Sequence, residues 1–184
     1  SVTEDTAASG TITATDIDGQ SLTYTYSTPS KGTIVSDKGS YIYTPTANAT
    51  GADSFTVVVS DGIESVTQTV NVNITAENDT PITDATSSLS VTEDTAASGT
   101  ITASDADGDT LSYTYSTPSK GAIVSDNGSY IYTPTANATG SDSFTVTVSD
   151  GTESVTQTVN VNIAAVNDTP LLAVSGLSSI TENE

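Results

Sequence analysis

Cysteine, methionine, tryptophan, histidine and arginine are all missing from the 184 residues of this chain. Without cysteine there is no disulfide and no thiolate site for a soft metal. Small secreted domains often depend on disulfides, so we expect another source of stability, as in a bacterial surface protein. Without histidine or cysteine, the only plausible catalytic chemistry is a carboxylate pair, as in glycoside hydrolysis. We therefore expect no enzyme here.

Positive charge is also scarce, because three lysines face 23 acidic residues and the net charge is −20. Nucleic-acid binding needs cations against phosphate, so this class of partner is excluded. The same repulsion disfavours anionic membrane surfaces. No apolar run is long enough to cross a bilayer, so we expect no membrane insertion. The carboxylates must either be solvated or be neutralised in part by a bound cation.

A long internal repeat organises the chain. Residues 1–81 recur as residues 90–170 at an offset of 89 without insertion, and only 12 of these 81 positions differ. A third copy begins at Ser179. Copies so alike suggest recent duplication, which favours a role in which copy number matters, such as length.

The repeat frame differs from the expected domain frame. The sequence Asn-Asp-Thr-Pro occurs at 78–81 and at 167–170, where proline cannot continue a strand ladder. We expect a first domain over 1–80 with a truncated first strand, a second over 81–169, and the opening strand of a third over 170–184. The chain reads as a piece of a longer protein. We expect the apolar tail residues to pack on a neighbour or to fray; they are Leu171, Leu172, Val174, Leu177 and Ile180.

Apolar and polar residues alternate with a period of two, which predicts half-buried strands. The pattern is clear in Leu22–Tyr26, in Phe55–Val59 and in Val66–Ile74, where Gln68 is the exception. Alternation also places most tyrosines in the core. Asp, Gly, Asn and Pro mark turns at short intervals. About seven short strands in some 90 residues predict an all-β fold of tandem, seven-stranded Greek-key β-sandwiches placed end to end.

The acidic residues gather in turns and at strand ends. Each copy has a Glu-Asp pair, an Asp-x-Asp-Gly turn, an Asp-Gly turn and an Asn-Asp exit. Ca²⁺ takes six to eight hard oxygen ligands from carboxylates, amides and backbone carbonyls. The turns therefore have suitable chemistry for calcium, although Asp and Gly are also ordinary turn residues.

The order of these motifs resembles a cadherin domain, and in particular the tandem cadherin-like repeats of giant bacterial surface adhesins of the RTX or biofilm type. The second copy carries the whole series in order: Glu93-Asp94-Thr95, Asp105–Asp109 followed by Leu111 and Tyr113, Tyr132–Pro134, Asp142-Ser143-Phe144, Asp150-Gly151 and Asn167–Pro170. The resemblance covers essentially the whole chain. It implies an immunoglobulin-like sandwich with Ca²⁺ at the junction between consecutive domains.

Carried onto this chain, the resemblance implies one complete junction with one to three ions. Its ligands would be Glu4, the backbone carbonyl of Glu77, Asn78, Asp79, Asp105, Asp107, Asp109 and Asp150. The linker is one residue shorter than the usual cadherin linker. Asp53 is a weaker candidate, because cadherins have an acidic pair there.

Two further ligand sets are incomplete and should bind weakly or not at all. Asp16, Asp18 and Asp61 lack a preceding linker, and Glu93, Asn167 and Asp168 lack a following domain. Gln20 stands where the second copy has Asp109, and Val166 stands where the first has Glu77.

These observations predict a calcium-stiffened extracellular spacer of a bacterial surface adhesin, in which the ions fix the interdomain angle. The expected partners are neighbouring repeats of the same chain, with homotypic contact or strand addition also open. The alternative is an adhesive module that binds carbohydrate or its own kind through a sheet face, which would need exposed aromatics or an apolar patch there.

Overall fold

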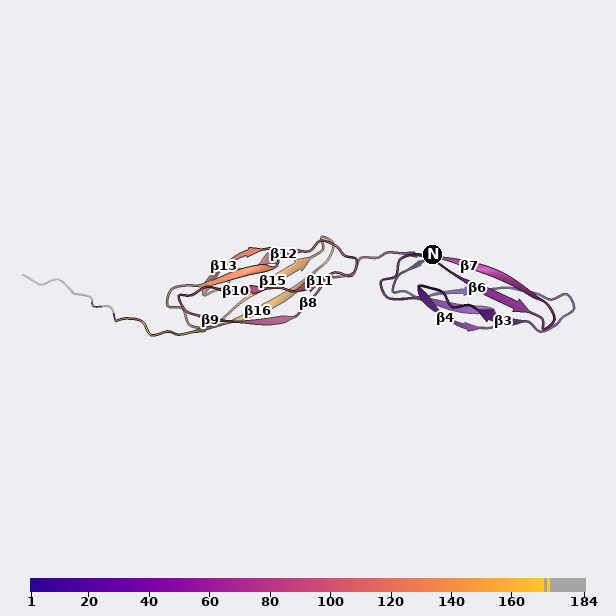
Figure 1. Ribbon diagram of the computed structural model, residues 1–184, viewed down its shortest axis with the longest axis horizontal. Coiled ribbons are helices and arrows are strands. Elements are labelled where there is room, and N and C mark those ends of the chain that lie inside the picture. Colours follow the sequence, from indigo (N-terminus) through magenta and orange to yellow (C-terminus); the bar gives the residue numbers. More distant parts are fainter. Residues whose placement is uncertain (171, 173–184) are drawn as a thin grey trace, which may run out of the picture. The chain divides into compact units, whose positions relative to one another are not determined.

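The computed structural model describes residues 1–170 and residue 172, and this part of the chain consists of strands and turns (Figure 1). The predicted all-β class is confirmed. No helix in the described residues has the length and apolar character needed to cross a bilayer. Of the tail residues named above, Leu172 is exposed. The predictions for Leu171, Val174, Leu177 and Ile180 lie outside the described residues.

The first repeat forms seven strands in two sheets. One sheet has the order β1-β7-β6-β3 and the other the order β2-β5-β4. All pairs are antiparallel except β1 with β7, which is parallel. The strands are β1 (Val2–Thr3), β2 (Ala8–Thr11), β3 (Thr23–Tyr26), β4 (Gly32–Asp37), β5 (Ser40–Pro45), β6 (Gly51–Ser60) and β7 (Ser65–Thr75).

The second repeat forms the same two sheets, β12-β15-β16-β9 and β10-β14-β13, with two more short strands paired as β11-β8. Its nine described strands exceed the expected seven because of this extra pair. They are β8 (Ile82–Thr83), β9 (Thr86–Thr92), β10 (Ala97–Thr100), β11 (Ala103–Ser104), β12 (Ser112–Tyr115), β13 (Gly121–Asp126), β14 (Ser129–Pro134), β15 (Gly140–Ser149) and β16 (Ser154–Ala164).

Aromatic rings pack around one phenylalanine in the core of each repeat. Phe55 has Tyr41 edge-on at 5.2 Å between ring centroids, and Tyr26 and Tyr43 lie within 6.4 Å. Phe144 repeats the arrangement with Tyr130 at 5.2 Å. All eight tyrosines are buried or half-buried. The prediction that most tyrosines belong to the core is confirmed.

The long last strand of each repeat is buried to different extents. In β16, Gln157, Val159, Val161 and Ile163 are buried because β9 pairs along residues 158–164. In β7, β1 pairs only with Ile74 and Thr75, so Val66 is largely exposed and the expectation that it faces the core is wrong. Gln157 is the counterpart of Gln68, the exception in the predicted alternation. Its burial in β16 is compensated because its Oε1 accepts a hydrogen bond from the Thr83 hydroxyl at 2.9 Å.

A buried carboxylate ties together the two sheets of each repeat. Asp142 accepts hydrogen bonds from the Ser119 hydroxyl at 2.7 Å and from the Tyr132 hydroxyl at 2.8 Å, and also from backbone N–H groups of Ser119, Lys120 and Ser143. Burial alone would raise the pKa of Asp142, but these donors outweigh it and lower the pKa to about 2. Asp53 accepts five equivalent bonds, and its pKa is lowered in the same way.

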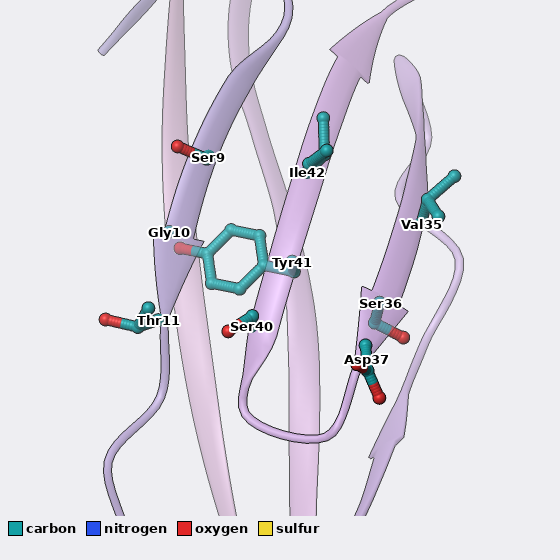
Figure 2. Close-up of a pocket in the computed structure, with 9 residues that line it drawn as sticks. All are labelled: Ser9, Gly10, Thr11, Val35, Ser36, Asp37, Ser40, Tyr41 and Ile42. Carbon is teal, nitrogen blue, oxygen red and sulfur yellow. The ribbon is translucent and has the colours of Figure 1, made fainter.

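A glycine lies under an aromatic ring on the neighbouring strand of each three-stranded sheet. The Tyr41 ring on β5 extends over Gly10 on β2 (Figure 2), and a Cβ at Gly10 would lie 2.3 Å from the ring. Gly99 and Tyr130 repeat this contact at 2.2 Å. The absent side chain makes room for the ring.

We predict that Tyr132→Phe lowers the free energy of unfolding by about 1.5–3 kcal/mol, because it removes a hydrogen bond to a buried charged group. The folded-state pKa of Asp142 lies below the unfolded value, so its stabilisation is present above about pH 4 and is lost as the pH falls toward 2. The variant raises this pKa, so acid destabilisation should begin at a higher pH. Urea unfolding between pH 2 and 6 measures both effects.

The matched control is Tyr115→Phe. The Tyr115 hydroxyl is buried without a hydrogen-bond partner. Its removal should leave stability within about 0.5 kcal/mol or raise it. Equal losses in the two variants would contradict the role assigned to the Asp142 carboxylate.

We also predict that Gly99→Ala destabilises the second repeat by about 1–3 kcal/mol, because the new methyl group displaces the buried Tyr130 ring from Phe144. Ser98→Ala, at the adjacent exposed position, is the control and should be close to neutral. Thermal unfolding measures both variants. An equally stable Gly99→Ala protein would show that the ring moves freely.

Candidate metal centre

The candidate metal centre lies within the first of two compact units. This unit contains Ser1–Pro81 together with Ser104–Leu111 and Asp150–Glu153. Two of these segments are acidic loops of the second repeat. Loop 104–111 leads from β11 to β12, and loop 150–153 connects β15 to β16. Residues 77–81, the linker that follows β7, therefore share a unit with both loops.

Loop 104–111 is folded by one of its own carboxylates. Oδ1 of Asp105 accepts hydrogen bonds from the backbone N–H of Asp107 at 3.0 Å and of Asp109 at 3.2 Å. Gly108 has a φ of +79°, which an L-residue rarely adopts. The Asp-x-Asp-Gly-Asp sequence thus closes on itself and gathers three side chains. Carboxylate oxygens of Asp105, Asp107 and Asp109 all lie within 4.8 Å of one another.

Loop 150–153 is closed in the same manner. Oδ1 of Asp150 accepts the N–H groups of Thr152 and Glu153, both at 2.6 Å. The bond from the Glu153 N–H, followed by that from the Asn78 amide, lowers the pKa of Asp150. The Asn78 amide donates to Oδ2 of Asp150 at 3.0 Å. Asp150 is therefore held as an anion next to the linker.

The linker backbone is bound by carboxylates at both ends. The Glu77 N–H donates to Oε1 of Glu4 at 2.9 Å, and the Asp79 N–H donates to Oδ2 of Asp107 at 2.8 Å. The Thr80 hydroxyl makes a short hydrogen bond to Glu153. These contacts bring together the predicted ligands Glu4, Asn78, Asp79, Asp107 and Asp150 in one unit.

Two carboxylate oxygens in this cluster are buried without a hydrogen-bond donor. Glu4 is only 3% exposed, and its Oε2 has no partner. Oδ2 of Asp105 is in the same condition. A buried carboxylate without a compensating group is strongly unfavourable. A cation bound beside these two atoms would compensate both.

The negative charges around these two oxygens favour a bound cation further. Burial raises the pKa of Asp79, and the negative charges of Asp107, Asp5, Glu4 and Asp105 raise it further. A carboxylate whose pKa is raised by neighbouring carboxylates shows that like charges are crowded together. Of the three lysines, Lys31 and Lys120 donate from Nζ to the carbonyl oxygens of Thr50 and Thr139, so these hydrogen bonds do not offset the charge of the cluster.

The donor set fits a hard cation. The cluster offers carboxylates, one amide side chain and the carbonyl groups of the linker, all of them able to supply oxygen ligands. Ca²⁺ accepts six to eight such ligands in flexible geometry, whereas Mg²⁺ demands a stricter octahedron and retains its waters. Neither a thiolate nor an imidazole occurs anywhere in the sequence. The residues present therefore suit calcium best.

Three contributors were not found by sequence reasoning. The Asn48 amide donates to Oδ2 of Asp79 at 2.9 Å, while the Asn48 N–H donates to Asp5 at 3.2 Å. Glu153 is the third, through Thr80. Asn48 has a φ of +58°, and asparagine is common at such turn positions. The turn conformation therefore explains why position 48 is an asparagine, whereas only the tertiary structure reveals its contact with the linker.

The structure corrects the role of Asp53. Both of its carboxylate oxygens are already engaged by five donors from Ser30, Lys31, Tyr43 and Ser54. These donors leave no lone pair directed toward an ion. Asp53 belongs to the core network described above, and its counterpart Asp142 does the same in the second repeat.

The two incomplete ligand sets lie in separate compact units. Asp16, Asp18 and Asp61 are in the first unit, while Glu93, Asn167 and Asp168 are in the second. Glu93 is buried and its Oε1 accepts the Val166 N–H at 2.6 Å, as Glu4 accepts that of Glu77. Each set therefore repeats part of the arrangement around linker 77–81.

The sheet β2-β5-β4 carries a shallow hollow of about 550 Å³ (Figure 2). Its lining includes Gly10, Tyr41 and the exposed apolar residues Val35 and Ile42. A matching hollow of about 530 Å³ in the second repeat includes Val124 and Ile131. The Tyr41 ring packs on Phe55, so the hollow offers an apolar patch without an exposed aromatic ring.

The chain is similar in sequence or in fold to several known proteins. A 155-residue match at 32% identity to chitinase A of Pseudoalteromonas piscicida covers 82% of the chain, but the chain spans only 19% of that enzyme's length. Domains EC1-2 of human protocadherin-24 match 90% of this chain and 93% of their own at 17% identity and a TM-score of 0.56, which supports the cadherin-like fold. An endo-fucoidan hydrolase of glycoside hydrolase family 107 matches at 24% identity and a TM-score of 0.43, covering 90% of this chain and 27% of that one.

The family assignment rests on the repeats themselves. A family model described as the bacterial Ig domain matches residues 1–74 and again residues 78–162. Each match covers one copy of the repeat, with its two sheets and its core phenylalanine. The chain therefore belongs to the bacterial Ig domain family.

Proposed function

We propose that this chain is a calcium-stiffened spacer of a bacterial extracellular protein, in which near-identical Ig-like repeats supply length. The ion binds among linker 77–81, loop 104–111 and loop 150–153. Its ligands are Glu4, the Glu77 carbonyl, Asn78, Asp79, Asp105, Asp107, Asp109 and Asp150. By holding the linker against both loops, the ion restricts the orientation of consecutive repeats.

The single observation that carries this proposal is the unpaired Oε2 of Glu4. The other oxygen of that carboxylate is bound by the Glu77 N–H, and the side chain is almost completely buried. Solvent therefore cannot compensate its charge, and the chain provides no donor. Because Asp105 also presents a buried, unpaired oxygen, a cation in this cluster satisfies two otherwise uncompensated groups.

A non-enzymatic role agrees with membership of the Ig-like family. The chitinase relative does not argue otherwise, because the match covers 19% of that protein. Asp105 and Asp150 are held in turns by backbone N–H groups, and Asp142 is buried in a core network. This arrangement suits ion binding and structural support.

A second candidate is adhesion through a sheet face, as the hollow over Val35 and Ile42 offers an apolar patch in both repeats. Carbohydrate recognition often uses a sugar stacked on an exposed ring, and every tyrosine here is buried or half-buried. Contact with another protein is therefore the form of adhesion that this patch suits better.

We predict that calcium at about 100 times its Kd adds about 2.7 kcal/mol to the free energy of unfolding, which corresponds to a rise in Tm of about 10 °C or more for a domain of this size. The rise should be largely lost in Asp107→Asn, since this variant removes a ligand charge. Calorimetry of dilute protein with calcium and then with chelator measures it.

The matched control is Asp18→Asn, which changes the same loop position in the first repeat, where no linker is bound. It should retain the calcium-dependent rise. An unchanged melting curve for the unaltered chain, with or without calcium, would reject the proposal and leave sheet-face adhesion as the better candidate.

A further inference from the structure

Turn 46–50 of the first repeat, which connects β5 to β6, is held by hydrogen bonds at both of its ends. The Thr46 N–H donates to the Lys31 carbonyl at 2.8 Å, and the Lys31 Nζ donates to the Thr50 carbonyl at 2.6 Å. The Ala49 N–H donates to the Thr46 carbonyl at 3.0 Å and closes the turn. The backbone of turn 46–50 is therefore fixed by contacts that lie outside the metal centre.

Asn48 lies within this turn in a left-handed conformation, with a φ of +58°. Asparagine and aspartate adopt such a conformation more readily than other L-residues do. The Asn48 N–H donates to Oδ1 of Asp5 at 3.2 Å. Asp5 directly follows Glu4, whose Oε1 accepts the Glu77 N–H. The backbone of Asn48 is thus bound to the segment that carries one of the proposed calcium ligands.

The side chain of Asn48 reaches another proposed ligand. Its Nδ2 donates to Oδ2 of Asp79 at 2.9 Å. The Asp79 N–H donates in turn to Oδ2 of Asp107 at 2.8 Å. Asp79 is therefore held at its backbone by loop 104–111 and at its carboxylate by turn 46–50. Among the described residues, no hydrogen bond reaches the other carboxylate oxygen of Asp79, which is Oδ1.

A neutral donor is the suitable group for this contact. Asp79 is half-buried and is exposed to the negative charges of four carboxylates, those of Asp107, Asp5, Glu4 and Asp105. A lysine in place of Asn48 would repel a bound cation, and an aspartate would repel Asp79, because like charges repel. An amide supplies an N–H donor to one carboxylate oxygen and carries no charge. It therefore orients Asp79 without opposing the cation.

We infer that Asn48 is a positioning residue of the proposed calcium site, whose amide holds Oδ2 of Asp79 so that Oδ1 stays available to the ion. This inference rests on the proposed function. Groups that hydrogen-bond to metal ligands fix the orientation of those ligands, and their loss typically lowers metal affinity about 10- to 100-fold. Asn48 is in this sense part of the site, although its own side chain is directed to a ligand.

The second repeat provides the same turn without this contact. Asn137 has a φ of +57°, and its N–H donates to Oδ1 of Asp94 at 3.2 Å. Asp168 is the counterpart of Asp79. Within the described part of the chain, no hydrogen bond joins the Asn137 amide to Asp168. Asn137 is therefore a matched control for Asn48.

Calorimetric titration of the full 184-residue chain with calcium chloride tests the inference on Asn48→Gly. Glycine adopts a positive φ without strain and retains the backbone N–H that binds Asp5, so the substitution removes the amide contact alone. The Kd for calcium should rise about tenfold or more, while the Tm in chelator should change little. Asn137→Gly should leave the Kd unchanged.

Equal Kd values for the unaltered chain and Asn48→Gly would overturn the role of Asn48 and leave the calcium site itself in place. A fall of the Tm in chelator without a change in Kd would do the same, because it would mark a purely structural amide. An equal rise of the Kd in Asn137→Gly would also contradict the inference, since it would assign the effect to the turn backbone. If the unaltered chain binds no calcium, the proposed function fails together with this inference.

Discussion

A carboxylate taken out of water must be compensated by donors or by a cation, and this constraint accounts for most of the molecule. Asp53 and Asp142 are compensated by hydroxyl and backbone donors, which tie the turn before β4 or β13 to the opposite sheet. Glu4 and Asp105 lie close to the linker, and each has one buried carboxylate oxygen that accepts no hydrogen bond. The first pair therefore stabilises each sandwich by itself, and the second offers two uncompensated oxygens to the proposed cation.

This division explains how so acidic a chain folds without disulfides. Much of the charge lies in exposed turns, and the buried carboxylates lie in two core networks, in the cluster around linker 77–81 and at Glu93. Repetition then multiplies the arrangement, because every added copy brings both an acidic pair of loops and an Asn-Asp linker.

Some residue roles could be predicted from the local sequence pattern, whereas others depended on the tertiary structure. Alternation placed Phe55, Val57 and Val59 in the core correctly, because side chains of a strand alternate between faces whatever surrounds them. The same alternation misplaced Val66, since burial of β7 depends on how far the neighbouring strand extends. Asp53 was a weaker candidate ligand because cadherins have an acidic pair at this position. Its five donors come from Ser30 and Lys31, more than twenty residues away, from Tyr43, ten residues away, and from its neighbour Ser54.

By itself, the sequence determined the all-β class, the repeat of 89 residues and the acidic turns, because composition, period and charge are local properties. Only the tertiary structure decided which carboxylates meet. Asn48, Asp79 and Asp107 are separated by 28 residues or more, and whether their side chains touch depends on how the strands return. The physical reason is that a carboxylate's role is set by the donors and charges within a few ångströms of it, and these come from distant parts of the chain.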